Sequence, residues 1–137
     1  MNHRQLFRQM GTISRQAMIK MNQKANAYDL DNNLFLILIR IVENPGLNQT
    51  QLAQLIQIDK TTLSRSLQKL EKKELIYKKT NLENKKFKDL FPSQEALKLY
   101  DILIGFEDSY IQSVLKQLSS TELAQLQTIL EKINLLQ

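Results

Sequence analysis

The sequence predicts a mainly α-helical protein of about six helices with one small β-hairpin. Only three glycines and two prolines occur in 137 residues, which favours long helices and few turns. Apolar residues recur at helical spacings of three and four along most of the chain. A lysine-rich segment between residues 76 and 91 departs from this spacing and is typical of two short strands joined by a polar loop.

Composition narrows the class of protein. An apolar content of 42% and a charged content of 24% fit one globular domain. The chain has no run of 18 apolar residues and no signal-peptide core near its start, so a cytoplasmic location without membrane contact is expected. Cysteine is absent, His3 is the single histidine, and no nucleophile–base pair or glycine-rich phosphate loop is visible. We therefore expect no enzyme, no metal site and no cofactor.

Two helices come first. Residues 4–27 carry an apolar stripe at helical spacing. A second helix is expected to have Asp31 as its N-cap and to follow an almost unbroken apolar stretch to Val42, before Pro45 and Gly46. Because this helix is apolar on nearly every side, it is expected to be surrounded by other elements.

The segment from residue 48 to 75 has the pattern of a helix-turn-helix. Asp59 is expected to cap its second helix, and Ile58 to fill the bend. Gln57 stands where such a turn usually has glycine. The left-handed conformation of this turn costs a residue other than glycine about 1 kcal/mol. The inward-facing residues of the first helix are expected to be Leu52, Ala53, Leu55 and Ile56. The inner stripe of the second helix consists of Leu63, Leu67 and Leu70.

Positive charge is concentrated in the same region. Residues 60–88 contain ten basic and three acidic side chains, and the distribution of charge decides what a protein attracts. The outward positions of the second helix combine short hydroxyls, which allow close approach to base edges, with long basic side chains that reach guanines or phosphates. The alternative is a solvated helix face whose Thr and Ser residues are caps. The candidate DNA-binding residues are Gln49, Thr50, Lys60, Thr61, Thr62, Ser64, Arg65, Gln68, Lys69, Lys85 and Lys86.

A hairpin is expected directly after this helix. Its strands are predicted at Ile76–Thr80 and Phe87–Phe91, and such a hairpin is the wing of a winged helix-turn-helix. Lys85 and Lys86 at the tip are placed to follow a phosphate backbone or to enter a minor groove. The alternative role of these lysines is a charged edge that prevents aggregation through strand pairing.

The rest of the chain is helical, from Ser93 to Leu118 and again after a serine cap near Ser120. Together with the first helix, these helices carry more apolar surface than a central lobe of residues 31–92 needs. We therefore expect residues 1–30 and 93–137 to form a homodimer, within one compact domain overall. The candidate interface residues are Leu6, Met10, Ile13, Ile111, Leu115, Leu126, Leu130 and Ile133.

These features carry a resemblance. The helix order, the stretch LAQLIQIDKTTLSRSLQKLEKKELI, the charged wing and the tail LSSTELAQLQTILEKI resemble the MarR family of bacterial transcriptional regulators over essentially the whole chain. Family members usually carry Asp-x-Arg on the wing and Leu-Thr-x-x-Gly at the next helix, where this chain has Asn84 and Lys86, then Pro92, Ser93 and Ala96. Lys86 thus replaces the arginine that commonly enters the minor groove, and it keeps the charge without the planar fork.

The resemblance implies a dimer that reads a pseudo-palindromic duplex and often represses genes until an effector weakens binding. Family effectors commonly occupy a cleft between the dimer helices and the DNA-binding lobe. Because cysteine is absent, oxidation of a thiol is excluded, and an organic ligand or none remains. The candidate pocket residues are Arg15, Met18, Met21, Tyr28, Phe35 and Tyr100. The alternative is that these are ordinary core residues.

A second class of function remains open. A winged helix can also act as a protein–protein adaptor that never touches DNA. Such an adaptor would not need the concentration of positive charge between residues 60 and 88, so the sequence favours a DNA-binding regulator.

Overall fold

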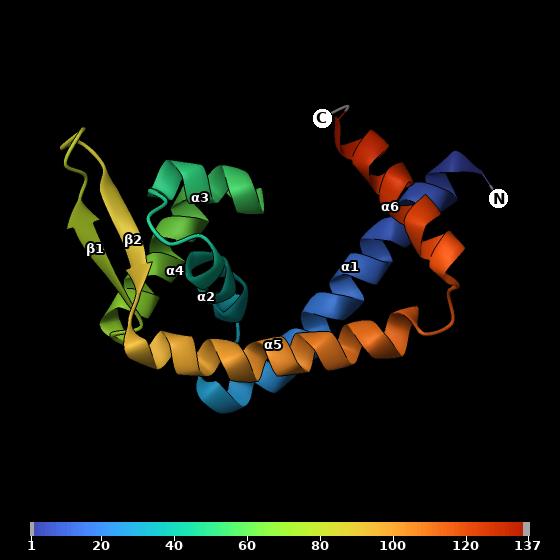
Figure 1. The fold of residues 1–137 in the computed structure, drawn as a ribbon, viewed down its shortest axis with the longest axis horizontal. Helices are drawn as coiled ribbons and strands as arrows, with labels where there is room; N and C mark the ends of the chain where they lie inside the picture. The colour runs from blue at the N-terminus through green and yellow to red at the C-terminus, as the bar shows by residue number, and fades with distance from the viewer. Residues whose placement is uncertain (1, 136–137) are drawn as a thin grey trace. The chain divides into compact units, whose positions relative to one another are not determined.

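The computed structural model describes residues 2–135 and confirms a mainly helical winged architecture (Figure 1). The described residues divide into two compact units, one up to Phe106 and one from Glu107 on. None of the described helices combines the length and the hydropathy that a membrane span requires. In chain order the elements of the described part are α1 (His3–Ala25), the 3-10 turn η1 (Asn26–Tyr28), α2 (Leu34–Glu43), α3 (Gln49–Ile56), α4 (Lys60–Lys72), β1 (Ile76–Thr80), β2 (Lys88–Pro92), α5 (Gln94–Leu115) and α6 (Ser120–Leu135).

The core of the first unit is built around α2, as its apolar sequence predicts. α3, α4 and β2 all lie against this helix, and Leu103 of α5 is fully buried in the same cluster. Among the described residues no polar or charged side chain is buried, so the stability of this unit rests on the removal of apolar surface from water. The buried side chains of α2 are Leu34, Phe35, Ile37, Leu38, Ile39 and Ile41.

The start of α2 differs from the prediction, because Asp31 is not its N-cap. The cap position is held by Asn33, which is left-handed at φ 65° and makes no side-chain capping bond. Asn33 is fixed instead from α1: Asn22 Nδ2 donates to Asn33 Oδ1 at 2.8 Å, and Asn33 N donates to Asn22 Oδ1 at 2.9 Å. Within five residues here, Asp29, Asn32 and Asn33 all have positive φ, which Asn and Asp tolerate better than most residues.

The turn between α3 and α4 is as predicted. Gln57 is left-handed at φ 62° and ψ 52°, and the backbone N–H groups of Gln57 and Ile58 both donate to Ala53 O. Gln57 Nε2 also donates to Gln54 O at 2.7 Å, which stabilises a conformation that is unfavourable for a residue with a Cβ. The side-chain bond of Gln57 thus adds to the backbone bonds that hold this turn against α3.

One inward-facing prediction on α3 was wrong. Leu52 and Ala53 are buried and Ile56 is partly buried against the core, but Leu55 is 45% exposed. Leu52, Ala53 and Ile56 fall within an arc of about 100° around the helix, and Leu55 lies outside this arc. A helix of eight residues that contacts the core on one side has no second apolar side to bury.

The wing is a two-stranded antiparallel hairpin with a third segment beside it. Tyr77 pairs with Phe91, and the second strand begins one residue later than predicted. On the other edge of β2, Gly46 N donates to Leu90 O at 2.8 Å, and Leu90 N donates to Leu47 O at 2.9 Å. Gly46 has φ +93°, which suits glycine. β2 therefore joins the hairpin directly to the chain that enters α3.

The second unit contains the end of α5 and all of the described part of α6. α5 ends at Leu115, three residues before the predicted Leu118. The predicted serine cap of α6 is Ser119: its Oγ accepts from Glu122 N at 3.1 Å, and Glu122 Oε1 accepts from Ser119 N at 2.9 Å. This reciprocal pair is a capping box, which satisfies two backbone donors at the start of the helix.

The predicted dimer residues lie on the surface of the single chain. All eight are exposed or half-buried, and Leu6, Ile13 and Leu130 leave 51%, 54% and 47% of their surface in water. Exposed apolar side chains on three helices are what an unpaired interface presents. Their assignment to a dimer interface stays a prediction.

The two leucines of α3 provide a test of the packing. Leu52→Ala removes a fully buried side chain and is expected to lower the free energy of unfolding by about 2–5 kcal/mol. Leu55→Ala, the matched control on the same helix, is expected to change it by about 0.5 kcal/mol or less. Urea denaturation at one fixed protein concentration measures both, and equal losses would contradict the packing described for α3.

Candidate nucleic-acid interface

The burial of one side of α4 determines which of its side chains point outward. Leu63, Leu67 and Leu70 are buried, so the residues between them must point away from the core. The α4 outer face consists of Lys60, Thr61, Thr62, Ser64, Arg65, Gln68 and Lys69. Six of these side chains are exposed and Ser64 is half-buried. The prediction that these side chains point away from the core is therefore confirmed. Their contact with DNA stays a prediction.

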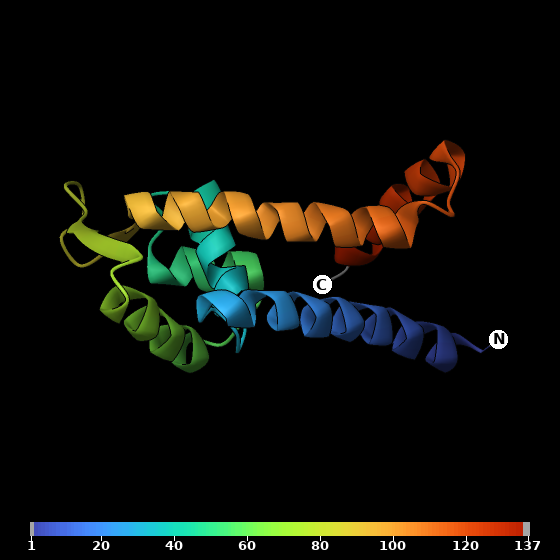
Figure 2. The same cartoon turned by 90° about the horizontal axis from the view of Figure 1, so that it is seen from below.

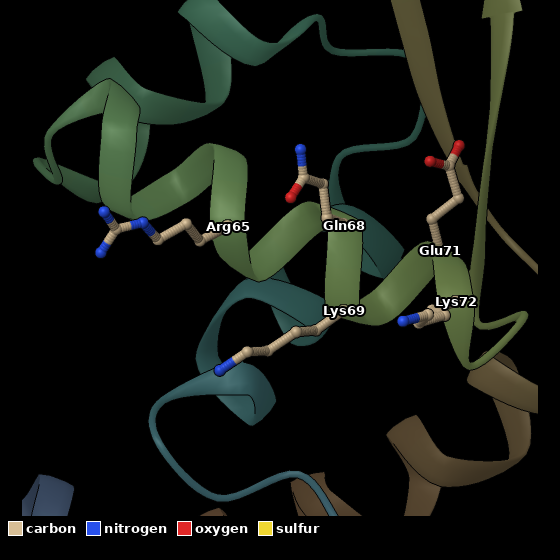
Figure 3. Close-up of a pocket in the computed structure, with 5 residues that line it drawn as sticks. All are labelled: Arg65, Gln68, Lys69, Glu71 and Lys72. Carbon is tan, nitrogen blue, oxygen red and sulfur yellow. The ribbon is translucent and has the colours of Figure 1, made fainter.

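A shallow groove runs along the second half of the helix. Its volume is about 520 Å³ and its lining residues are Arg65, Gln68, Lys69, Glu71 and Lys72. Figure 3 shows these five side chains on successive turns of α4, with Arg65 and Lys69 extending to the same side. Three cations and one carboxylate line the groove, so it favours an anionic partner.

Asp59 fixes the start of α4. Its Oδ1 accepts from Thr62 N at 2.9 Å and its Oδ2 accepts from Thr62 Oγ1 at 2.8 Å. The backbone N–H of Thr62, and to a smaller extent its hydroxyl, donate hydrogen bonds that hold the pKa of Asp59 below its ordinary value of 3.8. The Thr62 hydroxyl thus donates to the cap, as in the alternative interpretation of this face, and its oxygen remains available only as an acceptor.

The pleat of the hairpin brings a second set of cations together. Alternate residues of a strand share a face, so Lys78 and Lys88 lie on the same face of the hairpin as the buried Ile76 and Leu90. Where the core ends, this face borders the start of α3. The α3–wing groove, of about 260 Å³, is lined by Asn48, Gln49, Thr50, Lys78, Lys86, Phe87, Lys88 and Leu90.

The start of α3 adds to the positive character of this groove. Asn48 caps the helix through its bond from Gln51 N, and a helix N-terminus carries a partial positive charge. Gln49 Nε2 donates to Lys60 O at 3.4 Å, so this side chain bridges the starts of α3 and α4. Of the residues that line this groove, Gln49, Thr50 and Lys86 were predicted from the sequence, whereas Asn48, Lys78 and Lys88 were not. The period-two pattern from Ile76 to Lys78 was the signal that could have found Lys78.

The six predicted effector residues do not share one environment. Met21 and Phe35 belong to the core, so burial accounts for them without a ligand. Tyr28 is 37% exposed beside the ring of Phe106, and Tyr100 Oη donates to Glu43 Oε2 at 2.7 Å. Of the other two, Arg15 is exposed on α1 and Met18 is partly buried against the core. The effector pocket stays a prediction.

The geometry defines a winged helix-turn-helix protein with a cationic helix face beside a cationic groove at the wing. Comparison with known proteins agrees with this class. The model of the MarR family matches residues 30–88. The uncharacterized HTH-type transcriptional regulator YybA of Bacillus subtilis (strain 168) is 33% identical over 128 residues, which cover 93% of this chain and 85% of YybA.

Two solved structures extend the comparison. A regulator from Listeria monocytogenes that is assigned to the MarR family, solved with 26mer DNA, has a TM-score of 0.89 and 35% identity, covering 93% of this chain and 85% of its own. The S. aureus MepR–DNA complex has a TM-score of 0.85 and 28% identity, covering 99% and 97%. This chain belongs to the MarR family of winged helix-turn-helix transcriptional regulators. That family is one of regulators and not of enzymes, in agreement with the sequence analysis.

The Asp59 cap predicts a specific pH dependence. Because the folded-state pKa lies below 3.8, ionised Asp59 stabilises the protein above that value, and this contribution is lost as pH falls through the folded pKa. Asp59→Ala is expected to lower the Tm at pH 7, while Asp59→Asn keeps the capping oxygen and most of the stability. The Tm advantage of the native protein over Asp59→Asn should be constant above about pH 5 and shrink below it. Thermal unfolding followed by circular dichroism measures this, and a difference that does not vary with pH would contradict it.

Proposed function

We propose that this chain is a sequence-specific DNA-binding regulator that acts as a homodimer on a pseudo-palindromic duplex and represses the genes beside it. The observation that carries the proposal is the cationic α4 outer face, which stands on the same lobe as the α3–wing groove. Two relatives of the same fold, in the comparisons above, were solved with DNA. A regulator of this kind acts in the cytoplasm, where the DNA is.

The chemistry of each surface suits one part of a duplex. An α-helix fits the major groove of B-DNA, and Arg bidentate to guanine is the commonest specific contact. Arg65 therefore reads base edges from the α4 outer face, and Lys69 reads a base or holds a phosphate. Gln49, Thr50, Lys78 and Lys88 border a concave, positive groove that suits phosphate oxygens, which position the protein without reading sequence.

The wing tip contributes through charge. Lys85 and Lys86 are exposed on the loop, and Lys86 N donates to Asn84 Oδ1 at 3.2 Å. A lysine is a point charge without the planar fork of arginine. Lys86 therefore holds a phosphate or lies at the mouth of the minor groove, and it discriminates among bases less than an arginine at this position.

Dimerisation supplies the spacing that operator recognition needs. Two recognition helices must lie about 34–36 Å apart to enter successive major grooves on one side of a duplex. The exposed apolar residues of α1, of the end of α5 and of α6 form the joint that sets this distance. An organic effector releases the DNA by binding better to a dimer whose spacing does not match the duplex.

Replacing Arg65 tests the reading surface. In a gel shift with the DNA upstream of its own gene, Arg65→Ala is expected to weaken binding by about 1–3 kcal/mol, and only for the preferred sequence. Arg40→Ala, which removes an exposed arginine of α2 outside this surface, is the control and should leave binding unchanged. A loss that is equal on all sequences would make Arg65 a phosphate contact, and with it the slope of log affinity against log salt should flatten by about 0.9.

The same gel shift distinguishes the regulator from the protein–protein adaptor. If the native protein shifts no DNA at low salt and binds a protein in a salt-insensitive way, the result would support the adaptor.

Charges on α1 test the dimer. Leu6→Glu combined with Ile13→Glu places two carboxylates on an exposed apolar stripe, so the protein should fold but run as a monomer in light scattering, with weaker DNA binding. Ile19 is 57% exposed on roughly the opposite side of α1. Ile19→Glu is therefore the matched control and should stay dimeric. A double variant that remains a dimer would exclude α1 from the interface.

A further inference from the structure

One side chain of the wing is unusually exposed for its type. Leu82, in the loop between β1 and β2, has 95% of its surface in water, and the next most exposed large apolar side chain among the described residues is Phe7 at 65%. A leucine left in water forgoes the favourable free energy of burying its side chain. Isolated exposed apolar residues are common on proteins, so the surroundings of Leu82 decide whether it has a role.

The loop around Leu82 is held in one shape by its own asparagines. Asn81 Oδ1 accepts from the backbone N–H groups of Glu83 and Asn84, both at 2.9 Å. Asn81 Nδ2 donates to the carboxylate of Asp89 at 3.0 Å and 3.3 Å. Asn81 N also donates to Phe87 O at 3.0 Å. Leu82 is therefore presented by a braced turn, and little conformational entropy would be lost when it is buried in a partner.

The loop also lies where a nucleic acid would reach it. Figures 1 and 2 show the hairpin projecting from the helical lobe with its loop at the outer end. Four lysines, at positions 79, 85, 86 and 88, flank the loop, against Glu83 and the Asp89 carboxylate that Asn81 engages. A net positive loop is drawn to the minor groove, where negative potential is concentrated. An apolar protein partner would gain nothing from these lysines.

We propose that Leu82 is an apolar wedge that the wing inserts into the minor groove of DNA, where it partly unstacks one base step and bends the duplex. This inference rests on the proposed DNA-binding function and adds a second source of specificity to it. Proteins that bind the minor groove use leucine in this way between base steps. Pyrimidine–purine steps unstack most easily, so the wedge makes the protein prefer TA or CA steps beneath the wing, at positions that no hydrogen bond reads.

The experiment uses the full-length protein and a duplex that it selects from a randomised library. Leu82→Ala is expected to weaken binding of the selected duplex roughly tenfold, the order of the burial of one leucine, and to reduce the bend measured by energy transfer between the duplex ends. Leu82→Met keeps an apolar wedge and should retain affinity and bend. In a repeated selection, Leu82→Ala should lose the preference for flexible steps under the wing.

Lys86→Ala separates the wedge from a phosphate contact. A lost phosphate contact flattens the dependence of log affinity on log salt by about 0.9, whereas the loss of an apolar wedge leaves this slope unchanged. Leu82→Ala should therefore change affinity and bend without changing the slope, and Lys86→Ala should change the slope. The wedge is overturned if Leu82→Ala binds and bends the selected duplex like the native protein. If the native protein selects no duplex at all, the proposed function fails and the wedge with it.

Discussion

The arrangement of charge on α4 depends on three buried leucines. Leu63, Leu67 and Leu70 lie in the core, where α4 packs against α2. Because an α-helix turns 100° per residue, fixing this side also fixes the direction of every other side chain on the helix. Each buried leucine contributes about 2–5 kcal/mol, whereas an exposed ion pair contributes about 1 kcal/mol or less. The core, and not the charges themselves, therefore holds the α4 outer face in place.

Because the hairpin is pleated, the lysines of the wing lie on two faces with different neighbours. Lys78 and Lys88 share the face that carries Leu90 into the core, and they line the groove beside α3. Lys79 lies on the other face, where Tyr77 and its cross-strand partner Phe91 stack on each other. Lys79 Nζ is 5.7 Å from the ring centroid of Tyr77 and 5.3 Å from that of Phe91. A cation over paired rings stabilises the hairpin modestly. Lys78 and Lys79 are neighbours in the sequence, but they lie on opposite faces of the hairpin because successive residues of a strand point to opposite sides.

Most of the fold follows from the sequence, because long apolar patterns leave little choice of structure. The helix-turn-helix, the capping role of Asp59 and the hairpin were all predicted to within a few residues. Leu55 and Asp31 were predicted wrongly for one reason: apolarity and capping propensity are local, while the packing of α3 and the bonds between Asn22 and Asn33 are tertiary. Lys78 and Lys88 were missed because their partner, the start of α3, is distant in sequence and reaches β2 through residues 46–48.

The left-handed residue at the turn of the motif has a consequence for how the chain folds. Gln57 is a good helix former, and nothing in its intrinsic preferences interrupts the helical pattern on either side of it. A peptide covering residues 49–72 alone would therefore run through this position as one continuous, marginal helix. The bend separates two apolar stripes that both pack against α2, so burial of these stripes in the folded protein stabilises a turn that the intrinsic preference of Gln57 does not favour.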